Sequence, residues 1–399
     1  MKRRKNKLFI ILALLLAAGA AIYIYLTRPT DIQLENDVQI SIWYADDDVL
    51  WSRLDGYVEE YNSTEGAQRG ISVALRAFGN SEALEEAISE AVDTGGGLPN
   101  IAVCDVNIAA TLYEAQTLAD VDGYFGALET ANFGSDFIAA SSVDGRLIAV
   151  PVAADTDVFM INTQMYSGDI PFESFEQLCE AAKQYYAETG TSFFTMSDYS
   201  EFFLTAMLQL GDEFDAESPH DTSNENCKYI YNLLAETAYD RGFTTAQENP
   251  VAIFARGEIP AAIASSADVM AWADELDADS MVFAEYPCME DGRKSYAQRV
   301  TGLTISAAST DEEYASVLFI KWFTSVENNS DFVSGSGYLP ASGVLDAQAQ
   351  GSRLYEKLTA AMAEAKSSAR IWTRPADAEY AEKSRVFDGV LQSVMDSLK

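Results

Sequence analysis

The residue types that most often carry out catalysis are scarce in this chain. Its single histidine, His220, lies in the polar stretch SPHDTSNEN, which predicts a solvated loop. One imidazole cannot supply a histidine-based triad or a multi-histidine metal site. The motifs G-x-S-x-G, H-E-x-x-H, G-x-x-x-x-G-K-[ST] and G-x-G-x-x-G do not occur, and nothing in the sequence calls for a cofactor. These observations argue against an enzyme.

Carboxylates are abundant and offer a different chemistry. The chain has 62 Asp and Glu against 26 Lys and Arg, a formal net charge of -36. Such a surface repels phosphate backbones, which excludes nucleic-acid binding. A glycoside hydrolase needs two acids about 5 to 10 Å apart, but with so many acids some pair meets that condition by chance. Carboxylates and aromatic rings together can instead bind a small polar solute, because they match the hydroxyls and the faces of a sugar.

The four cysteines are widely separated and include no C-x-x-C pair, which excludes a zinc ribbon and a redox motif. Cys104 and Cys179 fall in apolar patterns and are expected to be small buried hydrophobic residues. The disulfide state of Cys227 and Cys288 stays open, as does that of the other two.

The amino terminus predicts a signal anchor over residues 1–28. MKRRKNK precedes an uninterrupted apolar run from Leu8 to Leu26, long enough to cross a membrane. The basic cluster places that end in the cytoplasm, so the rest of the chain faces outward. The alternative is a cleaved and secreted form, with peptidase cleavage at the small residues 17–20. Residues 29–37 form a short linker.

The first half of the body predicts an α/β fold. QISIWYA, ISVALRAF and NIAVCDV are typical of buried strands, and amphipathic helical segments separate them. This order predicts a parallel sheet with helices on both faces. Because ligands bind at the carboxyl ends of such strands, we expect Tyr44, Asp46 and Asp105 at the rim of a cleft.

The sequence pattern changes at RLIAVPVAADTDVFMINTQMY. We expect this extended, proline-containing segment to enter a second lobe. A mostly helical region follows, and RVTGLTISAAS returns to a strand. A length of 399 residues also favours two lobes over one.

Several segments, taken in order, resemble the family 1 extracellular solute-binding proteins of ABC importers, the maltose/oligosaccharide-binding type. These segments are ISIWYADDD, LPNIAVCDV, GRLIAVPVAADTDVFMINTQMY, VAIFARGEIPAAIASS, TGLTISAASTDEEYASVLFIKWFTS and GYLPAS. The resemblance covers about residues 38 to 399. It implies a two-lobed, periplasmic-binding-protein-like fold with a cleft that closes like a clamshell. Lobe 1 would comprise 38–149 and 300–340, and lobe 2 would comprise 150–299 and 341–399.

The resemblance implies an extracytoplasmic, membrane-tethered, monomeric binding protein. It would bind a small polar solute, with a carbohydrate expected, and deliver it to ABC permease subunits. The alternatives are a subunit that presents its ligand to a membrane sensor kinase and a glycoside-active enzyme. Departures from the family pattern at Met160, Ile263 and the segment Ala264-Ser265-Ser266 leave the ligand open.

The resemblance also implies further ligand-facing residues. Asp155 and Asp157 flank the predicted hinge, Trp272 follows the strand AAIASS, and Trp372 lies in the late loop SARIWTRPADAEY. Most candidates have a structural alternative: a helix start for Asp46, a polar turn for the hinge acids, and a core position for the aromatic rings.

Overall fold

The computed structural model describes residues 34, 36–170, 172–215, 219–246, 248–344, 351–373 and 378–398. The expected anchor (1–28) and most of the linker (29–37) lie outside the described residues. Within the described part of the chain, no helix is long and apolar enough to cross a membrane.

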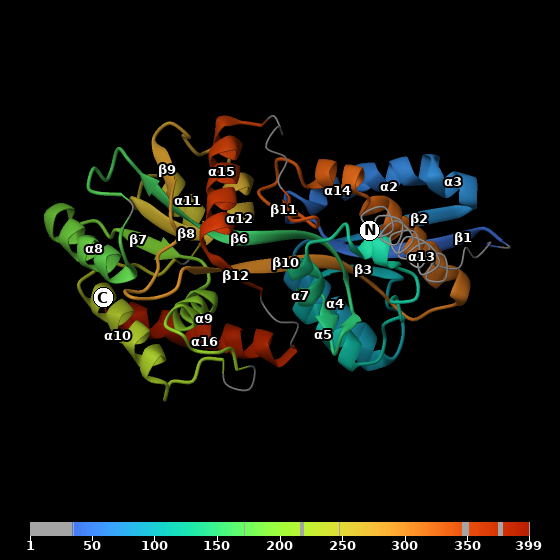
Figure 1. Cartoon of the computed structure of the whole chain (residues 1–399), viewed down its shortest axis with the longest axis horizontal. Helices are drawn as coiled ribbons and strands as arrows, with labels where there is room; N and C mark the ends of the chain where they lie inside the picture. Colours follow the sequence, from blue (N-terminus) through green and yellow to red (C-terminus); the bar gives the residue numbers. More distant parts are fainter. Residues whose placement is uncertain are drawn as a thin grey trace, which may run out of the picture.

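Two α/β lobes share one sheet that runs through the whole molecule (Figure 1). Among the described residues this sheet has ten strands, in the order β2-β1-β3-β10-β6-β8-β7, with β11 and β9 paired to β6 and β12 paired to β10. The strands are β1 (Val38–Ala45), β2 (Ile71–Phe78), β3 (Ile101–Asp105), β6 (Val150–Asn162), β7 (Phe194–Met196), β8 (Ala261–Ser265), β9 (Met281–Ala284), β10 (Ser295–Ile305), β11 (Leu339–Pro340) and β12 (Arg370–Thr373). A small hairpin of β4 (Ser142–Val143) and β5 (Arg146–Leu147) lies apart.

Lobe 1 is built around β2, β1 and β3, which run parallel as the sequence predicted. Its helical segments are η1 (Trp51–Arg53), α2 (Leu54–Ser63), α3 (Glu65–Arg69), α4 (Ser81–Thr94), α5 (Val106–Glu114), α6 (Ala127–Thr130), α7 (Ser135–Ala140), α13 (Thr310–Phe323) and α14 (Val326–Val333). The ends of α4 follow from local chemistry: the side chain of Asn80 accepts a hydrogen bond from the N–H of Ala83, and Gly95 ends the helix at φ 71°.

Lobe 2 is built around β8 and β7, which are parallel to each other. Its helices are α8 (Phe175–Thr189), α9 (Tyr199–Gln209), α10 (Glu225–Tyr239), α11 (Pro250–Ala255), α12 (Ser266–Ala271), α15 (Arg353–Ser368) and α16 (Ala378–Ser397). A phenylalanine-rich core fills the space between this sheet and α8, α9 and α10, and includes Phe175, Phe194, Phe202 and Phe243. The helix α9 contacts α10, α16 and β10, so almost all of its residues are buried.

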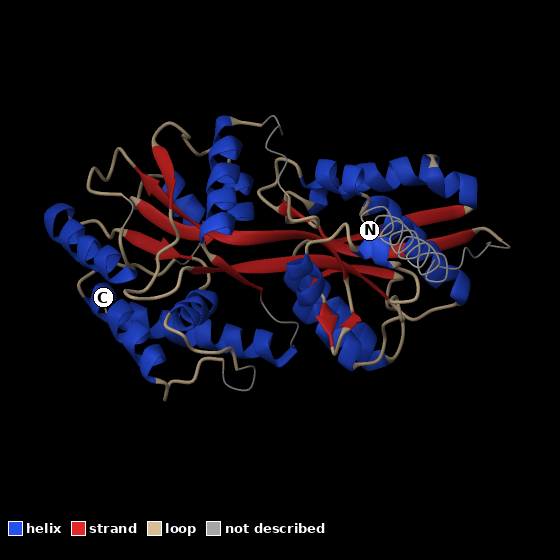
Figure 2. Cartoon of the chain, viewed as in Figure 1, coloured by secondary structure: helices blue, strands red, loops and turns tan. Residues whose placement is uncertain are grey.

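Two antiparallel strands, β6 and β10, pass from one lobe to the other without a break (Figure 2). At its lobe 1 end β6 pairs with β11, and at its lobe 2 end it pairs with β8 and β9. Every residue of β6 before Asn162 is buried. These strands hold the lobes together, and their side chains lie where the lobes meet.

The cysteines and the histidine can be compared with their predicted environments. All four cysteines are free, and Cys104 and Cys179 are buried as expected. His220 lies in a turn, as the loop prediction expected, but its ring is half-buried and not fully solvated. Its Nε2 lies 2.7 Å from the Ser200 hydroxyl, and its ring stacks on Phe387 at 4.2 Å. Burial lowers the pKa of His220 to about 4. The sequence could not show this, because Phe387 lies far away along the chain.

Candidate ligand-binding site

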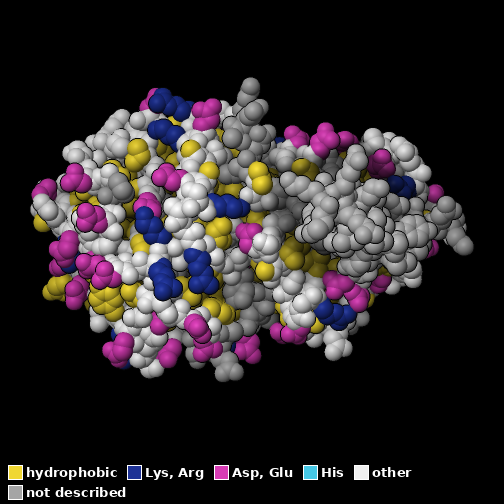
Figure 3. All heavy atoms as spheres, viewed as in Figure 1, with side chains coloured by type: hydrophobic (Ala, Val, Ile, Leu, Met, Phe, Trp, Pro, Cys, Tyr) yellow, Lys and Arg dark blue, Asp and Glu magenta, His cyan; other side chains and the backbone are white. Residues whose placement is uncertain are grey.

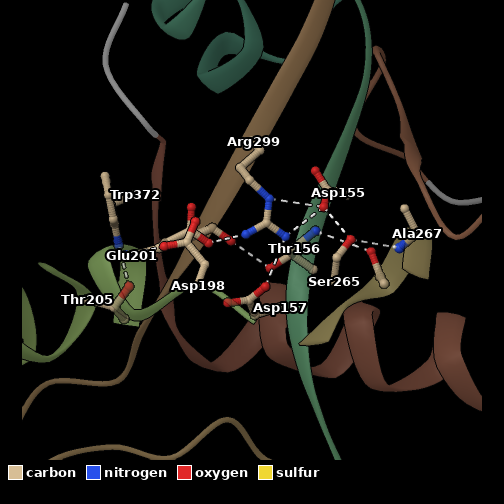
Figure 4. Close-up of polar contacts among 12 residues, drawn as sticks. Asp155, Thr156, Asp157, Asp198, Glu201, Thr205, Ser265, Ala267, Arg299 and Trp372 are labelled. Atoms are coloured by element: carbon tan, nitrogen blue, oxygen red, sulfur yellow. Dashed lines mark hydrogen bonds and ion pairs between the residues drawn. The ribbon is translucent and has the colours of Figure 1, made fainter. Parts of the chain in front are cut away.

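A buried group of charged residues lies on the strands that connect the lobes (Figure 4). Arg299 of β10 donates to Asp155 Oδ2 from Nη2 (2.6 Å) and from Nε (3.0 Å). Its Nη2 also lies 2.9 Å from Asp157 Oδ1, and its Nη1 pairs with Glu201. We call these four residues the Arg299 cluster.

Strand register and a helix start bring the cluster together. Arg299 lies directly opposite Asp155 in the antiparallel ladder of β10 and β6. Asp157 is two residues further along β6, so it points to the same face of the sheet as Asp155. Glu201 lies in the first turn of α9, where the side chain of Asp198 accepts a hydrogen bond from the Glu201 N–H.

The cluster is an ion network in a largely dry environment. The side chain of Arg299 is 18% exposed, those of Asp155 and Asp157 are 10% and 2% exposed, and that of Glu201 is fully buried. Burial raises the pKa of Asp157, and the positive charge of Arg299 opposes that rise. Burial alone would lower the pKa of Arg299, but Asp155, Glu201 and Asp157 raise it well above its usual value. One cation is therefore shared by three carboxylates.

Among the described residues, all hydrogen bonds that hold the Asp155 carboxylate are made to one of its oxygens. Oδ2 accepts from Arg299 and from the Ser265 hydroxyl, which is 2.5 Å away. Ser265 in turn caps α12, because its oxygen accepts from the N–H of Ala267. The other oxygen of Asp155 points away from both Arg299 and Ser265 (Figure 4). The carboxylate is thus oriented by its neighbours, and within the described part of the chain its second oxygen accepts no hydrogen bond.

A second polar contact lies in lobe 1. The hydroxyl of Tyr338, just before β11, donates to Asp48 Oδ2 at 2.5 Å. Burial raises the pKa of Asp48, and the charge of Asp155 adds to that rise. Asp48 follows β1, so it lies at the carboxyl end of a lobe 1 strand, where the sequence predicted ligand contacts.

The structure brings Asp155 and Asp157 together and distributes the other predicted residues elsewhere. Tyr44 is 4% exposed, packs in the lobe 1 core and donates its hydroxyl to Asp55 at 3.2 Å. Its strand neighbour Trp43 is also buried, on the opposite face. Both are covered because helices lie on both faces of the lobe 1 sheet. Asp46 is exposed, and Asp105 caps α5 by accepting from the N–H groups of Asn107 and Ile108.

The two predicted tryptophans of lobe 2 pack against apolar side chains. Trp272 is half-buried at the end of α12. Trp372 is 7% exposed, packs with Leu204 and Tyr380, and donates its indole N–H to the Thr205 hydroxyl at 3.0 Å. Trp372 also borders a cavity of about 650 Å³ between α7 of lobe 1 and β12 of lobe 2.

Sequence reasoning did not find Arg299 or Glu201. Arg299 had a visible signal, since it is a cation within the apolar strand pattern SYAQRVTGLTI. A buried arginine needs carboxylate partners, and the hinge acids were available. Glu201 had a weaker signal: α9 (YSEFFLTAMLQ) is apolar on all sides, which is typical of a buried helix, and Glu201 is its one acid.

The architecture defines the class of protein: two α/β lobes, connecting strands that cross between them, and polar residues at the crossing. The family profile described as "Bacterial extracellular solute-binding protein" matches residues 56–363. The chain therefore belongs to the bacterial extracellular solute-binding proteins, the ligand-capturing components of ABC transporters. A search of curated protein sequences gave no significant match.

Solved structures support the same fold. The cyclic alpha-maltosyl-1,6-maltose binding protein from Arthrobacter globiformis is 19% identical, with a TM-score of 0.72 over 91% of this chain and 95% of that one. Maltose-bound MalE3 of T. maritima gives the same identity and TM-score over 90% and 95%. UgpB from Mycobacterium tuberculosis, in complex with glycerophosphocholine, is 18% identical with a TM-score of 0.73 over 90% and 95%.

Proposed function

We propose that this protein binds a small polar solute, a carbohydrate, in a cleft between its lobes and delivers it to an ABC permease. The observation that carries the proposal is the Asp155 carboxylate, one oxygen of which is held by Arg299 and Ser265 while the other accepts no hydrogen bond from the described residues. A fixed acceptor at the meeting of two lobes suits a ligand hydroxyl, and little reordering is needed on binding. Similarity to proteins whose titles name maltose-type sugars supports a carbohydrate.

The proposal includes the way the protein works in the cell. The lobes comprise 38–149 with 300–340 and 150–299 with 341–399, and the protein acts as a monomer. A retained segment 1–28 tethers the body to the membrane and keeps it near the permease, which raises its effective concentration there. The body faces outward, and Asp and Glu side chains spread over both lobes of the face shown in Figure 3.

We further propose that binding occurs without turnover. The free protein, incubated with oligosaccharides that bind it, is expected to return them intact when products are followed by chromatography. Hydrolysis that survives purification and disappears in Asp155→Asn would establish an enzyme instead.

The binding proposal is tested by finding a ligand and then removing the acceptor. A thermal-shift screen of mono- and oligosaccharides, polyols, amino acids and polyamines identifies the solute class, since a bound ligand raises the melting temperature. Calorimetric titration of Asp155→Asn should then show affinity at least about tenfold lower, because a hydrogen bond to a charged group contributes about 1.5 to 3 kcal/mol. The matched control is Asp120→Asn, at an exposed acid. Equal affinity of the two variants would refute the assigned role of Asp155, and a screen that selects only amino acids or polyamines would refute the carbohydrate.

A further inference from the structure

Lobe 2 contains a cavity of about 410 Å³ beside the point where β6 separates from β10. The helix α15 covers it, packing against both β6 and β9, and Figure 1 shows α15 crossing β6 at this place. This volume falls within the range of small-molecule sites, which is about 300 to 1,000 Å³. The cavity is distinct from the space between α7 and β12, with which it shares no lining residue.

The lining of this cavity is mainly apolar and aromatic. Three rings contribute to it, those of Phe283, Tyr286 and Tyr296, together with the small side chains of Ala361 and Ala365 on α15. Tyr296 is 2% exposed, and its phenol ring forms part of the cavity wall.

The charged side chains in the lining are all acidic. They are Asp157, Glu285 and Glu364, and no described lining residue is a lysine or arginine. Asp157 shares Arg299 with two other carboxylates, Glu285 pairs with Lys294 at 2.5 Å, and Glu364 is exposed at the rim. The negative charge around the cavity therefore exceeds the positive charge paired with it.

Aromatic rings beside excess negative charge attract organic cations. A cation over a ring gains about 0.5 to 2 kcal/mol or more, and the gain is largest where water is excluded. A neutral ligand of the same shape would obtain only the apolar contacts. We propose that this cavity of lobe 2 is a second ligand site that binds a small alkylammonium cation, in addition to the solute proposed for the interlobe cleft.

The test compares choline chloride with its neutral isostere 3,3-dimethylbutan-1-ol, using the full-length chain at constant ionic strength. Choline should raise the melting temperature and give a saturable calorimetric isotherm. The alcohol should bind at least about tenfold more weakly, because it lacks the charge. Absence of choline binding at millimolar concentration, or equal binding of the alcohol, would overturn the proposal.

Two variants on one helix locate the bound cation. Ala365→Leu fills the cavity and should abolish choline binding, whereas Ala363→Leu adds the same side chain on the exposed side of α15 and should leave it unchanged. Choline binding that survives Ala365→Leu would place the cation elsewhere, for example among the acids of the interlobe cleft, and would overturn the proposal. Tyr296→Phe provides a second measurement: it keeps the ring, so choline should bind within about threefold of wild type, and complete loss would contradict recognition by the ring face.

Asp157 of the Arg299 cluster lines the cavity, whereas Asp155, the proposed acceptor for the sugar, does not. The two proposals are therefore distinguished by their variants. A sugar that binds wild type and Ala365→Leu equally supports the cleft, whatever choline does. Choline binding lost only in Ala365→Leu supports the cavity, whatever the sugar screen finds.

Discussion

Arg299 holds three carboxylates that would otherwise repel one another in a buried setting. Arg299→Ala should destabilise the fold by about 3 to 5 kcal/mol, because it leaves Asp155, Asp157 and Glu201 without their shared cation. Urea unfolding of the ligand-free protein measures this loss.

Two further variants show whether the loss of stability is specific to the Arg299 cluster. Arg299→Lys keeps the charge but cannot reach three carboxylates with a planar fork, so it should lie between wild type and Arg299→Ala. Arg146→Ala removes an exposed ion pair with Asp120 and should change the free energy of unfolding little. Similar losses in Arg299→Ala and Arg146→Ala would show that the cluster contributes no more than a surface pair.

His220 should make the fold sensitive to mild acid. Its pKa is about 4 in the folded protein and near 6.5 when unfolded, so between these values the unfolded chain binds the proton that the folded chain resists. The stability contributed by neutral His220 is complete above about pH 6.5 and is lost as pH falls toward 4. The variant His220→Phe keeps a ring to stack on Phe387 but cannot titrate. Its melting temperature should fall less between pH 7 and pH 5 than that of wild type.

The acidic residues around position 220 are the same in wild type and in His220→Phe. Asp198 caps α9 and its charge acts on the histidine. Asp388 of α16 accepts from the N–H of Ser200, the residue whose hydroxyl contacts His220. Their titration cancels in the comparison. Identical pH profiles for wild type and His220→Phe would show that the histidine does not resist protonation in the folded state.

A substitution of Trp372 tests whether this residue packs in the core or contacts the ligand. Because its ring is buried against Leu204 and Tyr380 and its N–H is bonded to Thr205, Trp372→Ala should cost about 3 to 5 kcal/mol of folding stability. A ligand-free melt measures this. An unchanged melting temperature, together with weakened ligand binding, would return Trp372 to the ligand site that the sequence predicted.

The turn between α14 and β11 lies against the start of α12. A Cβ on Gly337 would lie 2.1 Å from the carbonyl oxygen of Ser266, whereas one on Gly335 would meet nothing within 4 Å. Both glycines have positive φ, 84° and 78°, so an alanine at either is strained to a similar degree. Gly337→Ala should therefore lose about 1 to 3 kcal/mol more than Gly335→Ala in urea unfolding, owing to overpacking alone. Equal losses would show that the turn moves away from α12 at little cost.

The strands and helices of lobe 1 were predictable, because their patterns are local. Apolar runs gave β1, β2 and β3, and the parallel order followed from the helices between them. The order β3-β10-β6 was not predictable in this way, since residues almost 200 positions apart in the chain become neighbours. The placement of Tyr44 failed for a related reason: strand alternation separates two faces, but it cannot show that both faces are covered.

The candidate site was predictable only in part. Asp155 and Asp157 were found through their position in an extended segment between lobes. Arg299 and Glu201 complete the cluster through strand register and the packing of α9, which sequence spacing does not encode.

At the scale of the whole molecule, β6 and β10 connect the lobes, and we expect the lobes to rotate relative to each other about these strands. A ligand that touches both lobes favours the closed arrangement. Small-angle scattering should therefore show a smaller radius of gyration when the solute found by screening is added. Asp155→Asn at the same solute concentration should show less compaction, since less protein is bound. An unchanged wild-type radius at saturating solute would indicate a site within one rigid lobe.

The position of β10 between β3 and β6 also determines when the chain can fold. The lobe 1 sheet lacks its fourth strand until residues 295–305 are present, and its core also requires α13 and α14, which end at Val333. During synthesis and export, most of the chain must therefore emerge before even the amino-terminal lobe can close its core. We expect a newly made chain to stay unfolded through most of its passage across the membrane, as export through a narrow channel requires.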